Sequence, residues 1–101
     1  MDQVEQTPLE PAAPAAEVDD FEHLYLTVRR TLAEALSRSS TDYEQRLWRA
    51  RSTRVKRLRE TLNPDDSTQV LEAIAMLHAE QQTATAGIVT QLAAADPRSH
   101  Q

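Results

Sequence analysis

The chain has 101 residues and a formal net charge of −5, so it holds one small domain at most. It contains no cysteine, which excludes a disulfide scaffold, a thiol nucleophile and a cysteine-ligated metal, and which makes a reducing cytoplasmic location the default expectation. The single glycine disfavours turn-rich β architectures, and the lack of any apolar run of about 20 residues predicts that no helix spans a membrane.

The two ends of the chain differ from its middle in composition. Residues 1–18 carry three prolines, several alanines and acids, and almost nothing apolar that a fold could bury. Such a segment cannot offset the entropy lost on ordering, so we expect a disordered acidic tail here. Pro97 limits any helix at the other end, and residues 97–101 are expected to fray. Residues 19–96 are therefore predicted to form a single helical domain.

The first helix is predicted over about residues 20–37. Asp19 is a suitable N-cap, and Glu22 stands at the third helical position, as in a capping box. Apolar side chains recur at helical spacing and define one face: Phe21, Leu24, Tyr25, Val28, Leu32, Ala35 and Leu36. The Ser- and Thr-rich stretch at residues 37–41 then favours a short loop, because these side chains compete for backbone hydrogen bonds.

The second helix is predicted over residues 42–62, where Thr41 and Glu44 match a second capping box. Its apolar face carries four residues: Trp48, Val55, Leu58 and Leu62. An Asn-Pro-Asp-Asp sequence then ends the helix and predicts a tight connection to the next one.

The third helix is predicted over about residues 65–94, with two possible starts. Either Asn63 caps it and Pro64 takes the first helical position, or Ser67 is the cap and the start moves by one turn. Its apolar stripe consists of Val70, Leu71, Ile74, Leu77, Ile88 and Leu92. Gly87 lies within this region and indicates either a local bend or a close backbone crossing.

These elements predict an all-α fold, either a three-helix bundle or a helical hairpin with a third helix docked on it. If the second and third helices pair antiparallel, Trp48 should lie near Gln81, whose side chain would accept the indole N–H. Arg51 should then reach the rim near His78 with its aliphatic stem buried. Roughly 75 ordered residues give a thin core, which favours a homodimer over a monomer.

No residue pattern typical of an enzyme or a metal site occurs. The His78-Ala79-Glu80 sequence matches half of a zinc deaminase signature, but the required cysteines are absent. Asp19 and His23 share a helix face as two ligands without a third. There is no glycine-rich phosphate loop. We therefore expect no catalytic residue, no metal, no cofactor and no small-molecule substrate.

Charge is unevenly distributed along the chain. Residues 1–22 hold seven acids and no Lys or Arg, whereas residues 46–59 hold seven bases and no acid. At about 100° per residue, four of these bases fall together opposite the Trp48 side of the second helix. They define the basic face, a candidate surface for an anionic partner: Arg46, Arg49, Lys56 and Arg57. A merely solvated face, or one screened by the acidic tail, stays open as an alternative.

Two large apolar residues, Leu26 and Met76, point away from the main face of their helices and are candidate contacts for a partner. The sequence therefore predicts a non-enzymatic helical module, such as an adaptor, chaperone or regulatory subunit, that binds another protein through helix–helix contacts. A homodimer is one form of this. The alternative is a nucleic-acid-associated regulatory protein that uses the basic helix at residues 46–59, although a net charge of −5 is untypical of that class.

Overall fold

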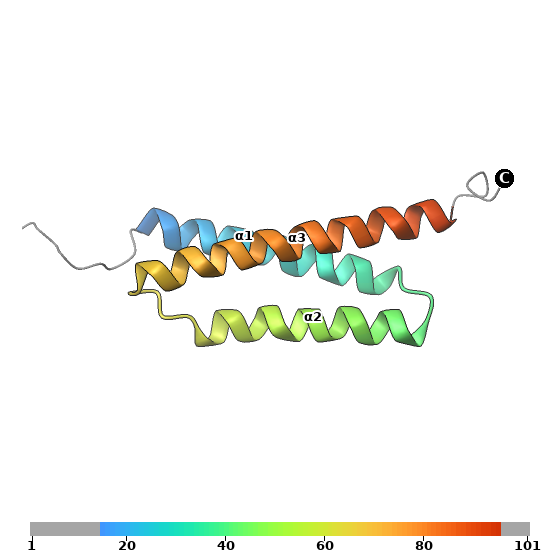
Figure 1. Cartoon of the computed structure of the whole chain (residues 1–101), viewed down its shortest axis with the longest axis horizontal. Coiled ribbons are helices and arrows are strands. Elements are labelled where there is room, and N and C mark those ends of the chain that lie inside the picture. Colours follow the sequence, from blue (N-terminus) through green and yellow to red (C-terminus); the bar gives the residue numbers. More distant parts are fainter. Residues whose placement is uncertain (1–14, 96–101) are drawn as a thin grey trace, which may run out of the picture.

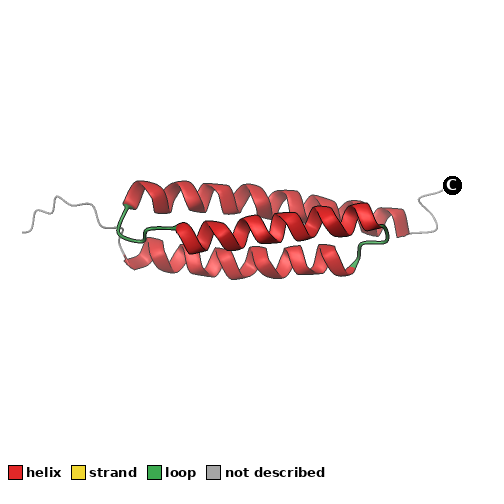
Figure 2. Cartoon of the chain, turned by 90° about the horizontal axis from the view of Figure 1, so that it is seen from below, coloured by secondary structure: helices red, strands yellow, loops and turns green. Residues whose placement is uncertain are grey.

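The computed structural model describes residues 15–95, which form three helices: α1 (Ala15–Ser37), α2 (Asp42–Thr61) and α3 (Ser67–Ala95). They lie side by side in an elongated bundle, with α2 antiparallel to α1 and α3 (Figures 1 and 2). The prediction of an all-α three-helix bundle is confirmed. The backbone of α1 lies close to both other helices, whereas α2 and α3 approach each other less closely.

The start of α1 differs from the prediction. The helix begins at Ala15, so residues 15–18, which were expected to belong to the tail, are helical. Asp19 lies inside the helix, and its predicted role as N-cap is wrong. Two alanines and a glutamate, all strong helix formers, carry the helix past the capping signal. The predictions for residues 1–14 and 97–101 lie outside the described residues.

The core forms mainly where α1 meets α3. Its buried apolar side chains are Phe21, Tyr25, Val28, Leu32 and Ala35 of α1, and Val70, Ala73, Leu77 and Ala84 of α3. Within α2, the buried residues are Trp48 and Val55. Each large apolar side chain contributes about 1.5–3 kcal/mol when buried, so α2 contributes the smallest share. Other contacts must therefore help to hold α2 in place.

The buried face of α3 differs from its predicted stripe. Leu71 and Leu92 are half-exposed, and Ala73 and Ala84 occupy the buried seam instead. Small side chains at a helix contact allow the two helix axes to approach closely. The sequence pattern gave weight to the large apolar residues of α3. The predicted apolar face was therefore rotated about the helix axis relative to the face that is buried.

The contact between α2 and α3 centres on Trp48 and Gly87. A Cβ atom at Gly87 would lie 2.5 Å from Cζ2 and 2.6 Å from Cη2 of Trp48, so only glycine leaves room for the indole. Gly87 therefore makes room for the side chain of Trp48, a close approach that the sequence had suggested for a backbone instead. The predicted hydrogen bond from the indole to Gln81 is wrong, because the Gln81 Oε1 atom has no hydrogen-bond partner.

This shift in register arises at the loop between α2 and α3. Asp66, rather than Asn63 or Ser67, caps α3, since its Oδ1 accepts the backbone N–H of Gln69 at 3.1 Å. The Asn63 Oδ1 instead accepts the backbone N–H of Asp65 at 3.0 Å inside the loop. α3 begins at Ser67, between the two predicted starts, but it begins beyond the end of α2 along the bundle axis (Figure 1), so the indole meets a later position on α3.

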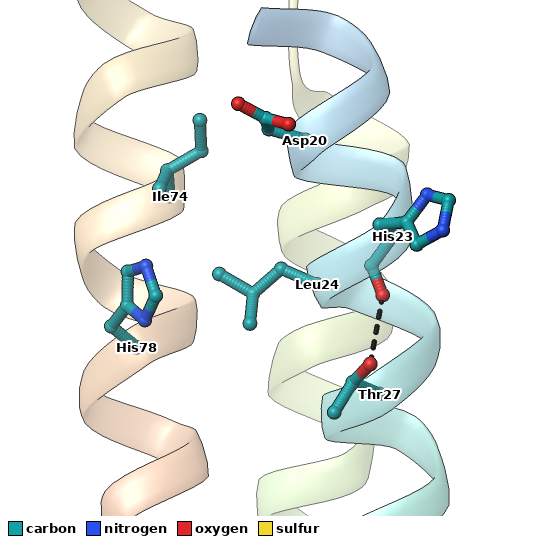
Figure 3. Close-up of a pocket in the computed structure, with 6 residues that line it drawn as sticks. All are labelled: Asp20, His23, Leu24, Thr27, Ile74 and His78. Atoms are coloured by element: carbon teal, nitrogen blue, oxygen red, sulfur yellow. Dashed lines mark hydrogen bonds between the residues drawn. The ribbon is translucent and has the colours of Figure 1, made fainter.

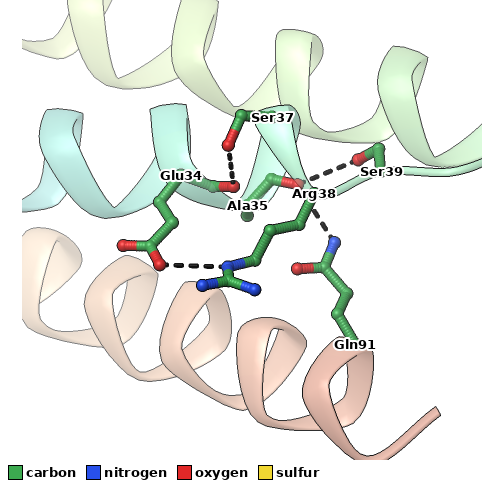
Figure 4. A network of polar contacts seen from close by, with 6 residues as sticks. All are labelled: Glu34, Ala35, Ser37, Arg38, Ser39 and Gln91. Carbon is green, nitrogen blue, oxygen red and sulfur yellow. Dashed lines mark hydrogen bonds and ion pairs between the residues drawn. The ribbon is translucent and has the colours of Figure 1, made fainter. Parts of the chain in front are cut away.

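A small polar network ties the C-terminal end of α1 to α3 (Figure 4). The Ala35 carbonyl accepts from Ser39 Oγ at 2.9 Å and from Gln91 Nε2 at 3.0 Å. Arg38 and Glu34 pair at 3.0 Å on the exposed side. A carbonyl that lacks a helical partner is thus satisfied by the loop and by the neighbouring helix. This network fixes the end of the bundle at which α2 begins.

Candidate functional site

Two of the bases of α2 bind a buried carboxylate on α3. Arg51 Nη1 lies 2.9 Å from Glu80 Oε1, and Arg54 Nη2 lies 3.3 Å from Glu80 Oε2. Among the residues that the structure describes, Glu80 is the one charged residue that is buried. The sequence placed Arg51 at the rim near His78 and did not identify this carboxylate as its partner.

A third base, Arg59, joins α2 to α1. Its Nη2 lies 2.9 Å from Glu22 Oε1, and its guanidinium carbon lies 5.2 Å from the centroid of the Tyr25 ring. That distance is within the range of a cation–π interaction. The hydrogen bond from Arg59 to Glu22 and the charge of Glu22 raise the pKa of Arg59 above its ordinary value.

The other four bases of α2 form the basic face and point into solvent. All four are exposed, namely Arg46, Arg49, Lys56 and Arg57. None of them makes an ion pair with another residue of the part of the chain that the structure describes. The bases of α2 thus divide by role: three bind the bundle, and four are available to a partner along about 16 Å of the helix axis.

Acidic residues bracket the basic face at both ends. Asp42 opens α2 and Glu60 lies near its end, and at about 100° per residue both fall on the side of the four bases. Thr53, in the middle, is uncharged. The charge order along this side is therefore negative, positive, neutral, positive, negative. A uniformly negative ligand meets repulsion at both ends, whereas a short segment with acids at its centre does not.

An open, mostly apolar groove, here called the α2–α3 groove, lies beside the N-terminal half of α2. It has a volume of 370 Å³ and is lined by Thr41, Tyr43, Glu44, Leu47, Trp48, Gly87, Thr90, Gln91 and Ala94. Tyr43 is 69% exposed and stands three residues before Arg46, so the two side chains are neighbours on the helix surface. The rim of the groove therefore adjoins the basic face.

The sequence did not reveal this groove, because the predicted apolar faces were assigned to the core. That assignment is wrong for Leu71 and Leu92, which are exposed, and Tyr43 and Val89, which belonged to no predicted face, are exposed as well. The single glycine on α3 was a signal of a close approach by another element. Its partner could not be named without the register between α2 and α3.

Leu26 and Met76 are both exposed, but they belong to different parts of the surface. Met76 lies on the side of α3 that also carries Gly87 and Thr90, since these positions coincide at helical spacing. It therefore extends the side of α3 that lines the α2–α3 groove. Leu26 lies on α1 and lines none of the grooves described in this section.

A second groove, the α1–α3 groove, lies between those two helices (Figure 3). It has a volume of 430 Å³ and is lined by Asp20, His23, Leu24, Thr27, Ile74 and His78. His23 and His78 point in different directions in this view. Within residues 15–95, no group of three or more His, Asp or Glu side chains is placed to hold a metal ion. In the same range, no helix is long and apolar enough to cross a membrane.

Comparison with known proteins adds no further constraint: no protein-family model, curated protein or solved structure matches this chain. The functional argument therefore rests on the basic face and on the α2–α3 groove beside it.

Proposed function

We propose that this chain is a non-enzymatic interaction module, such as an adaptor, chaperone or regulatory subunit, that binds an acidic helix of another protein. The supporting observation is that the basic face, unpaired within the described residues, adjoins the open α2–α3 groove. The partner helix lies along α2, with carboxylates toward the basic face and one apolar side chain in the groove.

Ion pairs alone do not give such a complex its affinity. An exposed pair contributes about 0.2–1 kcal/mol, so four pairs reach at most the roughly 4 kcal/mol of a millimolar complex. Burial of one large apolar side chain against Tyr43 and Trp48 adds about 1.5–3 kcal/mol. The groove therefore supplies affinity, while the basic face sets the register of the partner and speeds its association.

Nucleic acid is the second candidate partner. The three arginines of the basic face favour it, because guanidinium groups bind phosphates through paired hydrogen bonds. Asp42 and Glu60 disfavour it, since a continuous phosphate backbone would carry its negative charge past both acids. The charge order along α2 thus fits a short acidic protein segment better than a polyanion.

Two helical peptides of identical composition test this proposal. Both carry four glutamates, four lysines and one leucine; the centre-acidic peptide has the glutamates in the middle, and the end-acidic peptide has them at the ends. Both are electrically neutral, so general attraction to a charged surface cancels. We expect the full chain to bind the centre-acidic peptide about tenfold more tightly in isothermal titration calorimetry, because only this order complements α2.

Equal affinity for the two peptides would contradict recognition by charge order. Tighter binding of a DNA or RNA duplex, with affinity that falls steeply as salt rises, would replace the proposal with nucleic-acid binding. Leu26→Ala is a matched control, because it removes an exposed apolar side chain outside the proposed surface. It should leave the affinity for the centre-acidic peptide unchanged.

A further inference from the structure

An uncharged face runs along α3 outside the core. Leu71 and Leu92 are each 49% exposed, and Val89 is 59% exposed. They belong to a row of exposed positions with seven-residue spacing, here called the α3 stripe: Leu71, Ala75, His78, Gln82, Thr85, Val89 and Leu92. None of these side chains is an Asp, Glu, Lys or Arg. Seven-residue spacing is the repeat of helices that pack against each other along their length.

The α3 stripe shares His78 with the lining of the α1–α3 groove and is distinct from the buried core, the basic face and the α2–α3 groove. At about 100° per residue, it lies about 130° around α3 from the buried row that includes Leu77, and about 150° from Met76. Ile74 and Ile88 pack partly against the core and lie between it and the stripe, so they widen the apolar surface. Neither α1 nor α2 covers the stripe, since all of its side chains are exposed.

The order of apolar and polar residues along the α3 stripe is the same in both directions, because two apolar positions at each end flank three polar ones. Two α3 helices that run antiparallel about a point between Gln81 and Gln82 bring Leu71 opposite Leu92 at each end. The same rotation brings His78 opposite Thr85. Apolar positions thus meet apolar positions, and polar positions meet polar ones. Such reciprocity is what a two-fold symmetric interface between identical chains requires.

Charge also favours this surface for contact between two copies. The chain carries a net charge of −5, and like charges brought together raise the free energy of a complex. The stripe offers about 31 Å of helix without a formally charged side chain. On α2, by contrast, contact between two copies would bring the basic faces together.

We infer that the α3 stripe binds a second copy of this chain, with the two α3 helices antiparallel about a two-fold axis near Gln82. At each end of the interface, Leu71 packs against Leu92 of the second copy. The same geometry brings Val89 of the second copy to Ile74, which lines the α1–α3 groove (Figure 3). This dimer is independent of the proposed function, because the basic face lies on another helix and stays exposed.

Single cysteines test the geometry directly, because the chain has none of its own. Gln82→Cys places two thiols beside the two-fold axis, and we expect a disulfide-linked dimer under mild oxidation, since bonded cysteines need Cα atoms about 4.4–6.8 Å apart. Leu92→Cys places its two thiols about 30 Å apart in the antiparallel dimer and should stay monomeric on a non-reducing gel. Met76→Cys, on α3 but outside the stripe, is the matched control and should also stay monomeric.

Sedimentation equilibrium of the full chain measures the association itself. Leu92→Glu should weaken dimerisation about 100-fold, because it places a charge in the apolar contact at both ends of the interface. Met76→Glu is the matched control, since Met76 is 48% exposed against 49% for Leu92, and it should have no effect. Combining Leu71→Lys with Leu92→Glu should restore association, because only an antiparallel pair brings each lysine to a glutamate.

Three results would overturn the antiparallel dimer. In the first, the wild-type chain sediments as a monomer at millimolar concentration. In the second, the Gln82→Cys chain forms no disulfide-linked dimer. In the third, the Leu92→Cys chain forms a disulfide-linked dimer as readily as the Gln82→Cys chain does. Helicity measured by circular dichroism for each variant separates loss of association from loss of folding. Failure of the dimer would leave peptide binding by α2 unaffected, so the two proposals are tested separately.

Discussion

Replacing Trp48 with alanine should destabilise the protein by about 3–5 kcal/mol, which is the usual cost of removing a buried aromatic side chain. Trp48 is one of the two buried residues of α2, and its indole lies directly against Gly87. Urea unfolding followed by circular dichroism measures the loss. Tyr43→Ala is the matched control, because Tyr43 lines the same groove from an exposed position. It should change stability by less than about 0.5 kcal/mol.

Gly87 supplies the complementary test of this contact. Alanine exceeds glycine by about 1 kcal/mol in helix propensity, so Gly87→Ala should stabilise the protein when Trp48 has already been replaced by alanine. In the wild-type chain the same change should destabilise it, because a new Cβ would lie 2.5 Å from the indole. A stabilising Gly87→Ala in the wild-type background would show that the indole does not lie where the structure has it.

Replacing Glu80 with alanine should destabilise the protein by about 2 kcal/mol and loosen α2. Removing one member of a fully buried ion pair costs about 3–5 kcal/mol, because the remaining charge loses its partner. The expected cost here is smaller, since the Arg54 side chain is 64% exposed and that of Arg51 is 26% exposed, so water can hydrate both cations. Hydrogen exchange should show the largest loss of protection in α2, which has few buried apolar residues.

Arg54→Ala is the matched control for Glu80. It removes the more exposed member of the same cluster and leaves Glu80 paired with Arg51, so it should cost less than about 1 kcal/mol. If Glu80→Ala were as mild as Arg54→Ala, the carboxylate would not be holding α2 against α3. If protection were lost equally in all three helices, α2 would not be the element that depends on these ion pairs.

The parts of the fold that depend on local signals could be predicted from the sequence. The Thr-x-x-Glu sequence predicted the start of α2. The structure confirms it, since Thr41 Oγ1 accepts the backbone N–H of Glu44 at 3.1 Å. The start of α1 was not predicted, because a good capping residue at Asp19 does not stop a helix when alanines precede it. Local capping rules identify sites where a helix can begin, and neighbouring propensities decide which one is used.

The arrangement of α3 depended on information that periodicity does not contain. Ala73 and Ala84 are buried because α1 packs closely there, while Leu71 stays half-exposed on another face. Which face is buried is decided by the fit between helices, so a ranking by side-chain size fails. The predicted α2–α3 register was wrong for a related reason: it depends on how far the loop runs along the bundle axis before α3 begins, which the loop sequence does not state.

The candidate site was predictable in part. The outward position of Arg46, Arg49 and Lys56 follows from the apolar residues on the opposite side of α2, which a single-helix argument can give. The groove and the pairing of Glu80 with Arg51 join side chains from two helices, so both required the structure. Sequence alone therefore separated the four outward cations of α2 from the other three, but it did not identify the carboxylates that those three bind.

The most direct test of the central claim is a titration of the centre-acidic peptide into a chain whose basic face has been neutralised. The variant replaces Arg46, Arg49, Lys56 and Arg57 with glutamine, and none of these side chains pairs within the described residues, so helicity and stability should be retained. Loss of four exposed ion pairs should cost about 2 kcal/mol of binding, or about 30-fold in affinity. An affinity within about twofold of wild type, in a variant that remains fully helical, would contradict the claim that these four cations recognise the partner.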